Sequence, residues 1–589
     1  MNHPIIKLRT HETKTSTFTD LPKILEKIYL NRGVSEQSQL EYGLDKLPSP
    51  SLMKSNTEAG KLLAEAIVRQ DRLLIVADFD VDGATSCTLM LLALRSMGAK
   101  NVDYLVPDRF KFGYGLTPEI VDVAAQLSPD LIITVDNGIA SIDGVNRANE
   151  LSIKVLITDH HLPGRNLPNA LAIVNPNQHG CTFPTKALAG VGVAFYLMLS
   201  LRKALRDLQW FDNTKLPEPN LSQFLDLVAL GTVADIVPLE HCNRLLIVHG
   251  MRRIRAGQCR PGIKALLQIA NKDFSRIQTN DLGFAVGPRL NAAGRLDDMS
   301  LGIECLLSDS HSKAAQLAEE LDSLNKERRE IQTTMQQQAL DSLDKLSLES
   351  EKNNYGICLY QPKWHQGIIG LLASKVKDKA YRPTIVFANA DNHLNKVKSH
   401  KTSSSEEELL KGSARSIPGL HIRDVLDRLA TENPQLLNKF GGHAMAAGMT
   451  IRKSDLKEFS KAFNLLVKNE MEHESLENII WSDGELSSEV ISLDLAKMLR
   501  DAGPWGQAFE EPKFHGDFNV ISQRVLAGKH LKLELDNKTG AAFSAIAFFQ
   551  DDSILYAHLN KVRLVYKIDV NFFRDQENLQ LMIEEIFID

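Results

Sequence analysis

The amino-acid sequence predicts an α/β protein of several domains: a parallel-sheet domain, a long connecting helix, a second and smaller α/β domain, and a C-terminal β-barrel. Three observations support this prediction. Short apolar runs alternate with amphipathic stretches between about residues 60 and 160. The chain contains neither Gly nor Pro from 313 to 346. Towards the C-terminus, short strand-like runs are separated by Gly, Asp and Asn. A length of 589 residues suits about four domains.

The composition is that of a globular protein, and it excludes several functional classes. Hydrophobic residues make up 43% and charged residues 24%, which excludes a chain disordered throughout. The 68 basic and 74 acidic residues give a net charge of −6, so any nucleic-acid site must be a local basic groove. The 6 cysteines include no Cys-x-x-Cys pair, which predicts a reducing, cytoplasmic location. Because no run resembles a signal peptide or a membrane span, we expect no membrane association.

The parallel sheet is predicted from four short runs rich in Val, Ile and Leu: Leu73–Ala77, Tyr104–Val106, Leu131–Val135 and Val155–Thr158. Continuous apolar runs of this length are typical of parallel strands that are buried on both faces. Their spacing of roughly 25–30 residues favours βαβ units, although periodicity alone leaves short buried helices as an alternative.

The central and C-terminal parts follow a different pattern. The segment 313–346 predicts a long, solvated helix, with a coiled-coil dimer as the rival interpretation. Strands are expected at Ile357–Tyr360 and Thr384–Phe387, and a polar loop at 391–408. The barrel, for which an OB-fold is the commonest form in nucleic-acid enzymes, is predicted from four further runs. These runs are His530–Leu535, Ala541–Phe549, Val562–Val570 and Leu579–Ile583.

Three aspartates at alternate positions, Asp78, Asp80 and Asp82, directly follow the first predicted strand. Because ligands bind outside the carboxyl ends of strands in open α/β sheets, these carboxylates are placed to converge there. Oxygen ligands of this kind suit hard cations such as Mg²⁺ or Mn²⁺. The alternatives are a solvated acidic loop and the start of a calcium loop. The strand before the motif and the absence of a Glu at the twelfth loop position argue against the calcium loop.

Two further predicted strands end in similar chemistry. One leads to Asp136, and the next leads to Asp159, His160 and His161. A single Asp after a strand is usually a turn former or a helix cap, and a His pair is often structural. Together, however, three strands deliver carboxylates and imidazoles to one sheet edge, as a two-metal site requires. Asp235 offers a fourth loop that would be unremarkable alone.

A family resemblance rests on motifs in a fixed order. DFDVDG, VDNG, TDHH and GTVADIVPL resemble the motifs of the DHH phosphoesterase superfamily. Further motifs are similar to those of its RecJ branch, the single-strand-specific 5′-exonucleases: VPDRFKFGYG, GPRLNAAGR, WHQGIIGLLASK, GSARS, FGGHAMAAG and PWGQAFEEPKF. The resemblance implies an N-terminal lead-in, a DHH catalytic domain, a helical connector that includes the long helix, a DHH-associated substrate-binding domain and an OB-fold-like domain. Their expected bounds are 1–55, 56–250, 251–346, 347–467 and 468–589.

The same resemblance implies the roles of the acidic and histidine residues. The residues implied to hold two divalent ions, Mn²⁺ or Mg²⁺, are Asp78, Asp80, Asp82, Asp136, His160 and Asp235. The resemblance implies that Asp136 would bridge the two ions and that Asp136, His160 and His161 would form the catalytic set. Some relatives carry a His four residues before Asp80, where this chain has Val76, so Asp78 is expected to replace that ligand.

Substrate contacts are also implied by the resemblance. Arg109, Ser413 and Arg415 would bind the 5′-terminal phosphate. Arg289, Asn291 and Arg295 are expected to line the path of the strand, and His443 is expected to contact an anion. From the residues alone, Gly441-Gly442-His443 predicts a glycine-rich loop that approaches an anion, and tight helix packing explains the small residues equally well. Helix-surface arginines are the alternative for Arg289 and Arg295.

The functional prediction is a two-metal exonuclease that degrades single-stranded DNA from the 5′ end to 5′-mononucleotides in recombination and repair. Its expected partners are single-stranded DNA, a single-strand-binding protein and a helicase, and the chain is expected to act as a monomer. The rivals are an enzyme for short oligonucleotides, cyclic dinucleotides or pyrophosphate, and an inactive replication scaffold. The barrel argues against small substrates, and the complete set of ligands argues against a scaffold.

Overall fold

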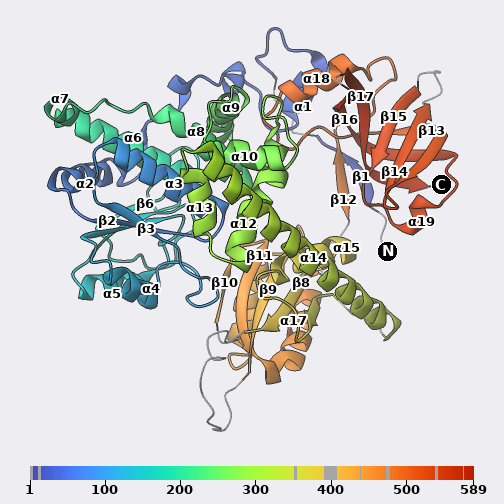
Figure 1. Ribbon diagram of the computed structural model, residues 1–589. Coiled ribbons are helices and arrows are strands. Elements are labelled where there is room, and N and C mark those ends of the chain that lie inside the picture. Colours follow the sequence, from blue (N-terminus) through green and yellow to red (C-terminus); the bar gives the residue numbers. More distant parts are fainter. Residues whose placement is uncertain are drawn as a thin grey trace. The chain divides into compact units, whose positions relative to one another are not determined.

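The computed structural model confirms the α/β fold class, and the chain divides into two compact units (Figure 1). We call Met1–Ile5, Asn291–Asp298 and Glu319–Asn478 the smaller unit, and the remaining residues the larger unit. The structure describes residues 4–10, 15–349, 355–390, 408–437, 439–471, 478–536, 542–574 and 576–588.

A five-stranded parallel sheet forms the centre of one part of the larger unit, in the order β3-β2-β4-β5-β6. Every residue of β2 and of β4 is buried, as the continuous apolar runs predicted. The second predicted run, Tyr104–Val106, starts two residues later than the strand β3 that it marks, and β6 is too short to have been recognised. The strands are β2 (Leu73–Ala77), β3 (Val102–Leu105), β4 (Leu131–Val135), β5 (Lys154–Thr158) and β6 (Ala172–Val174).

Helices cover both faces of this sheet (Figure 1). On one face, α4 (Pro118–Ala125) and α5 (Ile142–Glu150) pack over a core that contains Val76, Ile132 and Val155. On the other face lies α3, which is buried on nearly all sides because it also contacts three further helices. The helices around this face are α2 (Asn56–Arg69), α3 (Val81–Ser96), α6 (Gly190–Asp207) and α8 (Leu225–Ala234).

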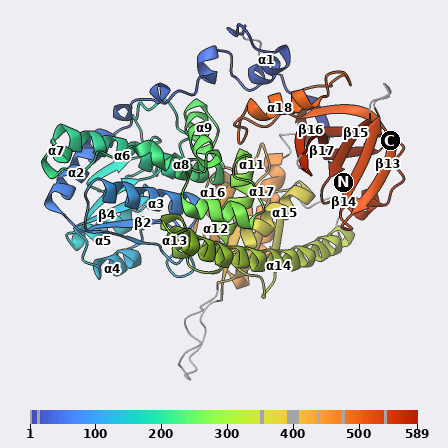
Figure 2. The same cartoon turned by 45° about the horizontal axis from the view of Figure 1, so that its top comes forward.

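A helical region leads from the sheet domain to the smaller unit. Its last helix, α14 (His311–Glu349), is continuous over 39 residues, as the segment without Gly and Pro predicted (Figure 2). Within the smaller unit, Met335 and Ala339 of α14 pack against Trp364. The preceding helices are α9 (His241–Arg255), α10 (Pro261–Ile269), α11 (Thr279–Asp281), the π-helical segment Leu282–Val286, α12 (Gly287–Leu296) and α13 (Ser300–Leu307).

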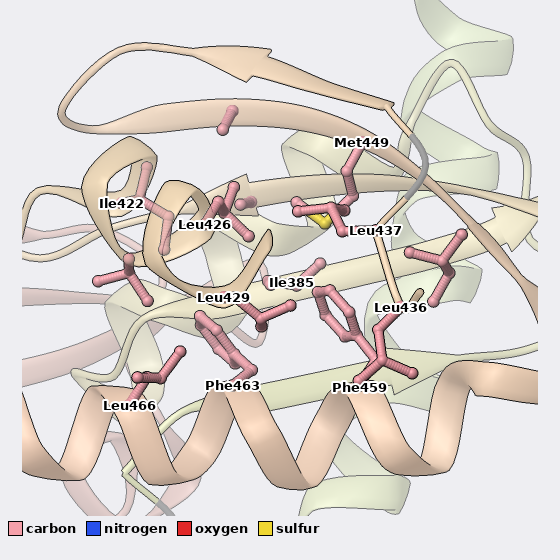
Figure 3. Close-up of a cluster of buried hydrophobic side chains, with 14 of the residues drawn as sticks. Ile385, Ile422, Leu426, Leu429, Leu436, Leu437, Met449, Phe459, Phe463 and Leu466 are labelled. Atoms are coloured by element: carbon pink, nitrogen blue, oxygen red, sulfur yellow. The ribbon is translucent and has the colours of Figure 1, made fainter. Parts of the chain in front are cut away.

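The smaller unit is built on a mixed sheet in the order β10-β11-β9-β8-β7, in which only β7 and β8 are parallel. One face packs against Phe459 and Phe463 of α17, which point at Ile385 and Leu429 (Figure 3). The other face is covered by α15 and α14. The elements are β7 (Ile357–Tyr360), α15 (Ile369–Ala380), β8 (Thr384–Asn389), β9 (Leu409–Arg415), α16 (Ile422–Glu432), β10 (Lys439–Gly442), β11 (Ala446–Arg452) and α17 (Leu456–Met471).

The prediction of a glycine-rich loop at Gly441-Gly442-His443 is wrong for the two glycines, because they belong to strand β10, and only His443 lies in the turn that follows; GSARS and the end of FGGHAMAAG lie in strands β9 and β11. The small residues serve close packing across the sheet: a Cβ on Gly412 would lie 2.5 Å from Cε1 of Phe387. Of the predicted polar loop 391–408, all but the last residue lies outside the described residues.

The C-terminal strands form a closed barrel in the order β13-β14-β15-β17-β16, which confirms the predicted barrel. The first strand was not predicted, because its burial pattern is irregular. The strands are β13 (Phe514–Leu526), β14 (His530–Asp536), β15 (Ala542–Ala547), β16 (Lys561–Phe573) and β17 (Gln576–Ile588). The short helices α7, α18 and α19 are Trp210–Thr214, Leu493–Asp501 and Asp552–Leu555.

The N-terminal segment is attached to the region before the barrel. It contains β1 (Ile5–Leu8), whose partner strand is β12 (Ile479–Ser482), and α1 (Lys23–Leu30). After α1, both guanidinium NH₂ groups of Arg32 contact the carboxylate of Asp483, at 2.8 and 2.9 Å, and both side chains are buried. Removing one partner of such a buried pair is strongly destabilising. In the described part of the chain, no helix has the length and apolar character to cross a membrane.

Candidate metal centre

The turn after β2 places Asp78 and Asp80 at the carboxyl end of the sheet. The Asp78 amide donates to the carbonyl oxygen of Val135 in the neighbouring strand, at 3.3 Å. Asp80 caps α3, and its Oδ1 accepts hydrogen bonds from the amides of Asp82 (2.9 Å) and Gly83 (3.1 Å). A Cβ on Gly83 would lie 2.4 Å from the Asp78 carbonyl oxygen, so the turn requires glycine there.

Asp82 lies in the first turn of α3, where its carboxylate is fully buried. Its Oδ2 accepts a hydrogen bond from the Gly190 amide at 2.5 Å, and its Oδ1 accepts one from the Val191 amide at 2.9 Å. These amides belong to the first turn of α6, where a negative charge is stabilised by the helix dipole. The contact orients the Asp82 carboxylate across a sequence separation of more than one hundred residues.

Asp136 follows β4 in the left-handed backbone conformation, with φ of +61°. Asp and Asn tolerate this conformation better than most residues, and it marks local strain that is typical of functional sites. The Asp136 amide donates to the Thr158 carbonyl, while the side-chain amide of Asn137 donates to the carbonyls of Val76 and Val135. The turn is therefore held by three strands at once.

Asp159 organises the two histidines after β5. Its Oδ1 accepts hydrogen bonds from the amides of His160 (2.7 Å) and His161 (3.0 Å) and lies 2.8 Å from Nδ1 of His161. Burial alone would lower the pKa of His161, but the hydrogen bond with Asp159 and the charges of nearby carboxylates outweigh it and raise the pKa. Asp159 had no predicted role, although its position directly before the two histidines was a usable signal.

The structure gathers all six predicted metal ligands. Nε2 of His160 lies 3.1 Å from Oδ1 of Asp136, 3.5 Å from Oδ2 of Asp235 and 4.0 Å from Oδ2 of Asp82. Asp235 is positioned by the C-terminal end of α8. In three overlapping groups the ligand atoms lie within 4.8 Å of one another. The groups are Asp82, His160 and Asp235; Asp78, Asp80 and Asp136; and Asp136, His160 and His161.

The electrostatics of this cluster fit divalent cations. Among the described residues, none donates a hydrogen bond to the buried Oδ1 of Asp78, Oδ1 of Asp136 or Oδ2 of Asp235. Burial, followed by the charges of neighbouring carboxylates, raises the pKa of each of these three residues. Buried carboxylate oxygens without donors are costly unless a cation compensates them. Carboxylates with one imidazole match Mn²⁺ or Mg²⁺.

The raised pKa of Asp136 leads to a stability prediction for the metal-free protein. In the folded chain this carboxyl holds its proton to a higher pH than in the unfolded chain, so stability is lost as pH rises through the folded pKa. Asp136→Asn removes this loss. In the presence of chelator, we expect the melting temperature of the variant to exceed that of the wild type by a margin that grows from pH 5 to pH 8. A margin that is independent of pH would contradict the prediction.

Two aromatic residues beside the cluster were missed by the sequence analysis. The Tyr114 hydroxyl donates to the Asp136 carbonyl at 3.1 Å and lies 3.2 Å from Nδ1 of His161. Phe79 contacts the edge of Tyr114, and the guanidinium of Arg109 lies over the Phe79 ring at 4.4 Å. Burial lowers the pKa of Arg109, opposed by the charges of Asp78 and Asp80. Arg109 therefore belongs to the surroundings of the acidic cluster.

The other predicted phosphate contacts lie in the smaller unit. Arg415 donates from Nη1 to Oγ of Ser413 (3.2 Å) and to the Ala414 carbonyl (2.8 Å). In the sheet register, Ser413 lies beside Gly448, which pairs with Gly441. A Cβ on either glycine would meet no described atom within 4 Å, so the sheet is open above them. His443 lies in the turn between β10 and β11.

The residues expected along the strand path all lie on α12. Arg289 is buried and donates from Nη1 to the Ala285 carbonyl at 2.6 Å. Arg295 donates from Nη1 to the Gly367 carbonyl at 3.1 Å. Asn291 is half-buried between them. Arg289 belongs to the larger unit, and Asn291 and Arg295 belong to the smaller one.

Comparisons with known proteins agree with this architecture. Three family models match: the N-terminal domain of the DHH family at residues 72–232, the DHHA1 domain at 353–469 and the RecJ OB domain at 482–585. The chain is 48% identical over 586 residues to the single-stranded-DNA-specific exonuclease RecJ of Dickeya dadantii, which covers 99% of both chains. It is 47% identical to the RecJ of Escherichia coli, with the same coverage.

A solved structure agrees as well. The crystal structure of RecJ in complex with Mn²⁺ from Thermus thermophilus matches with a TM-score of 0.76 and 25% identity, over 96% of this chain and 76% of that one. A second RecJ structure, bound to manganese, matches with a TM-score of 0.57 and 28% identity, over 72% of this chain and 98% of that one. The chain belongs to the RecJ family of DHH-domain proteins.

Proposed function

We propose that this protein is a metal-dependent exonuclease that hydrolyses single-stranded DNA from the 5′ end to 5′-mononucleotides, in DNA recombination and repair. The observation that carries the proposal is the buried cluster of carboxylates and imidazole at the carboxyl end of the parallel sheet. The chain that carries this cluster is 48% identical, over 99% of its length, to a single-stranded-DNA-specific exonuclease.

We assign Asp78 and Asp80 to one divalent ion, Asp82, His160 and Asp235 to the other, and Asp136 to both. When bound, two Mn²⁺ or Mg²⁺ ions supply Lewis-acid stabilisation of the oxygens that attack and leave the phosphorus. Asp159 holds His161 in one orientation through the contact at Nδ1. His161 is then placed to hydrogen-bond a phosphate oxygen or to move a proton during the reaction.

Substrate binding is assigned to both units. In this proposal the 5′-terminal phosphate is bound by Arg109, Ser413 and Arg415, because a guanidinium and a hydroxyl group are suited to a phosphate. Arg289, Asn291, Arg295 and His443 contact the strand, and the closed barrel at the C-terminus holds it further along. Catalysis is assigned to 56–250 and binding to 347–467 and 468–589.

The cellular setting forms the last part of the proposal. The six cysteines are free, which fits a cytoplasmic protein. We assign a single-strand-binding protein and a helicase as partners. An enzyme restricted to unpaired strands needs a helicase to separate the duplex and a binding protein to keep the separated strands from pairing again. The chain acts as a monomer in this proposal.

Digestion of end-labelled DNA tests the proposal directly. We expect single-stranded DNA to release mononucleotides from the 5′ end with Mn²⁺ or Mg²⁺, and to remain intact with EDTA. Blunt duplex DNA should resist digestion without a helicase. Release from the 3′ end, internal cuts or full activity in EDTA would each overturn the proposal.

The role of Arg415 leads to a prediction about strand polarity. Arg415→Ala should weaken the binding of 5′-phosphorylated strands at least about tenfold more than the binding of 5′-hydroxyl strands, because it removes a charged hydrogen-bond donor. The measurement is a titration of both strands in Ca²⁺. Arg428→Ala is the control, since Arg428 is ion-paired with Glu432 and Glu470 on the surface of the same unit. Equal losses of affinity for the 5′-phosphorylated and the 5′-hydroxyl strands would mean that Arg415 contacts a part of the strand other than its 5′ end.

A further inference from the structure

Ile236 has an unusual conformation directly after the metal-ligand candidate Asp235. Its backbone is left-handed, with φ of +59°, and its side chain is 67% exposed. This conformation is disfavoured for a β-branched residue, because the branched Cβ crowds the backbone. Strained backbone of this kind persists where the surrounding structure enforces it, most often at functional sites. Consecutive Cα atoms are about 3.8 Å apart, so Ile236 lies at the edge of the metal centre.

Phe284 is a second exposed apolar side chain, at 78% exposure. It lies in the π-helical segment Leu282–Val286, which runs directly into α12. The neighbouring residues Leu282, Ala285 and Val286 are buried, so the segment is anchored while Phe284 points to solvent. π-helical turns are rare and occur frequently at functional sites.

The π-helical segment packs along the last turn of α8, which ends at Ala234. A Cβ on Gly283 would lie 3.4 Å from Cγ1 of Val233, and a Cβ on Gly287 would lie 3.7 Å from the Cβ of Ala234. Phe284 follows Gly283, and Ile236 is two residues beyond Ala234. The segments that carry Phe284 and Ile236 therefore lie beside the helix end that carries Asp235.

We propose that Ile236 and Phe284 form a base-binding surface that receives the nucleobase next to the scissile phosphodiester, an inference that rests on the proposed exonuclease function. The carboxylates and histidines of the site are suited to binding metal ions and phosphate, and they provide no apolar surface on which the flat face of a base could stack. Stacking of a base on an aromatic ring is independent of sequence, as a nuclease that degrades any strand requires. A protein partner on the same surface would cover the metal centre and exclude the substrate.

This base-binding surface has a consequence for strand choice. A base in a duplex is stacked on its neighbours and paired with its complement, so it can reach Phe284 only after unstacking. For an unpaired base, the free-energy cost of reaching the same contact is much smaller, because no base pair has to be broken. The base-binding surface therefore selects for unpaired DNA at the reacting nucleotide itself. This selection adds to any exclusion of duplex DNA by its size.

The test combines protein variants with strands that lack bases. Phe284→Ala and Ile236→Ala are compared with wild type on a 5′-phosphorylated strand and on the same strand with tetrahydrofuran abasic residues at its first two positions. We expect Phe284→Ala to lower the single-turnover rate about tenfold on the normal strand. On the abasic strand we expect the variant and the wild type to react equally. On the normal strand, the rate of Phe284→Leu, which keeps an apolar side chain, should lie between the rates of Phe284→Ala and the wild type.

The control is Leu208→Ala. Leu208 is 51% exposed in the same unit, but it follows the C-terminal end of α6, about 27 Å along the helix from Gly190. This variant should match the wild type on both strands, and all variants should keep their Mn²⁺ affinity. Equal losses for Phe284→Ala on normal and abasic strands would overturn the inference, because the side chain would then serve packing. Wild-type rates on both strands would overturn it too. If the wild type itself degraded neither strand, the proposed function would fall first.

Discussion

Asp136→Asn should reduce cleavage of single-stranded DNA at least about a thousandfold, or roughly 4 kcal/mol of transition-state stabilisation, while the protein remains folded. Asp136 belongs to two of the candidate ligand groups, and its Oδ1 lies 3.1 Å from Nε2 of His160. Asparagine keeps the size of the side chain and tolerates the left-handed backbone, so the substitution removes chiefly the charge. Because the Asp136 carboxylate is proposed to contact both ions, loss of its charge should weaken the binding of both.

The measurement is the single-turnover rate in saturating Mn²⁺, with folding checked by circular dichroism. Asp143→Asn is the matched control, because Asp143 is exposed in the first turn of α5, shortly after the same strand. It should keep the wild-type rate. If Asp136→Asn retained more than about a tenth of that rate, Asp136 would not bridge two ions.

The second large effect is expected for Gly190→Ala. A Cβ at this position would lie 2.8 Å from both Cβ and Oδ1 of Asp136, and the Gly190 amide donates to Asp82. The new methyl group must therefore displace a carboxylate of the candidate metal centre or the start of α6. Because a misplacement of about 1 Å at a reacting centre costs about a hundredfold in rate, we expect a loss of at least that size.

Gly192→Ala provides the comparison within the same helix. Its Cβ would meet the end of the Leu188 side chain, Cδ2, at 3.2 Å, where a small rotation relieves the contact. This variant should keep most of the activity. Rates and Mn²⁺ affinities of both variants are measured together. Wild-type activity for Gly190→Ala would show that the close approach to Asp136 has no functional role.

The sequence was sufficient to identify the sheet and the candidate ligands because both depend on local patterns. Continuous apolar runs mark strands buried on both faces, and Asp80, Asp136 and His160 each lie within three residues of the end of such a run. Parallel strands bring these positions to one edge without further information. Their roles as metal ligands remain predictions, although the structure gathers their side chains.

What the sequence did not reveal depends on contacts between distant residues or on backbone detail. The Gly190 amide that orients Asp82 is separated from it by 108 positions, and no spacing rule connects the two. The left-handed conformation of Ile236 and the π-helical turn at Phe284 leave no pattern of hydrophobicity. Gly441 and Gly442 were mistaken for part of a loop because glycine usually weakens strands, whereas here they belong to β10, and in the neighbouring β9 a glycine lets Phe387 approach Gly412.

The central claim is that one cluster holds two divalent ions with Asp136 between them. The most direct test is to count the Mn²⁺ ions bound per chain by equilibrium dialysis, with free Mn²⁺ measured by electron paramagnetic resonance. We predict two ions for the wild type and a marked loss of affinity for both in Asp136→Asn. Fewer than two ions on the saturated wild type, or two ions bound with unchanged affinity by Asp136→Asn, would contradict the claim.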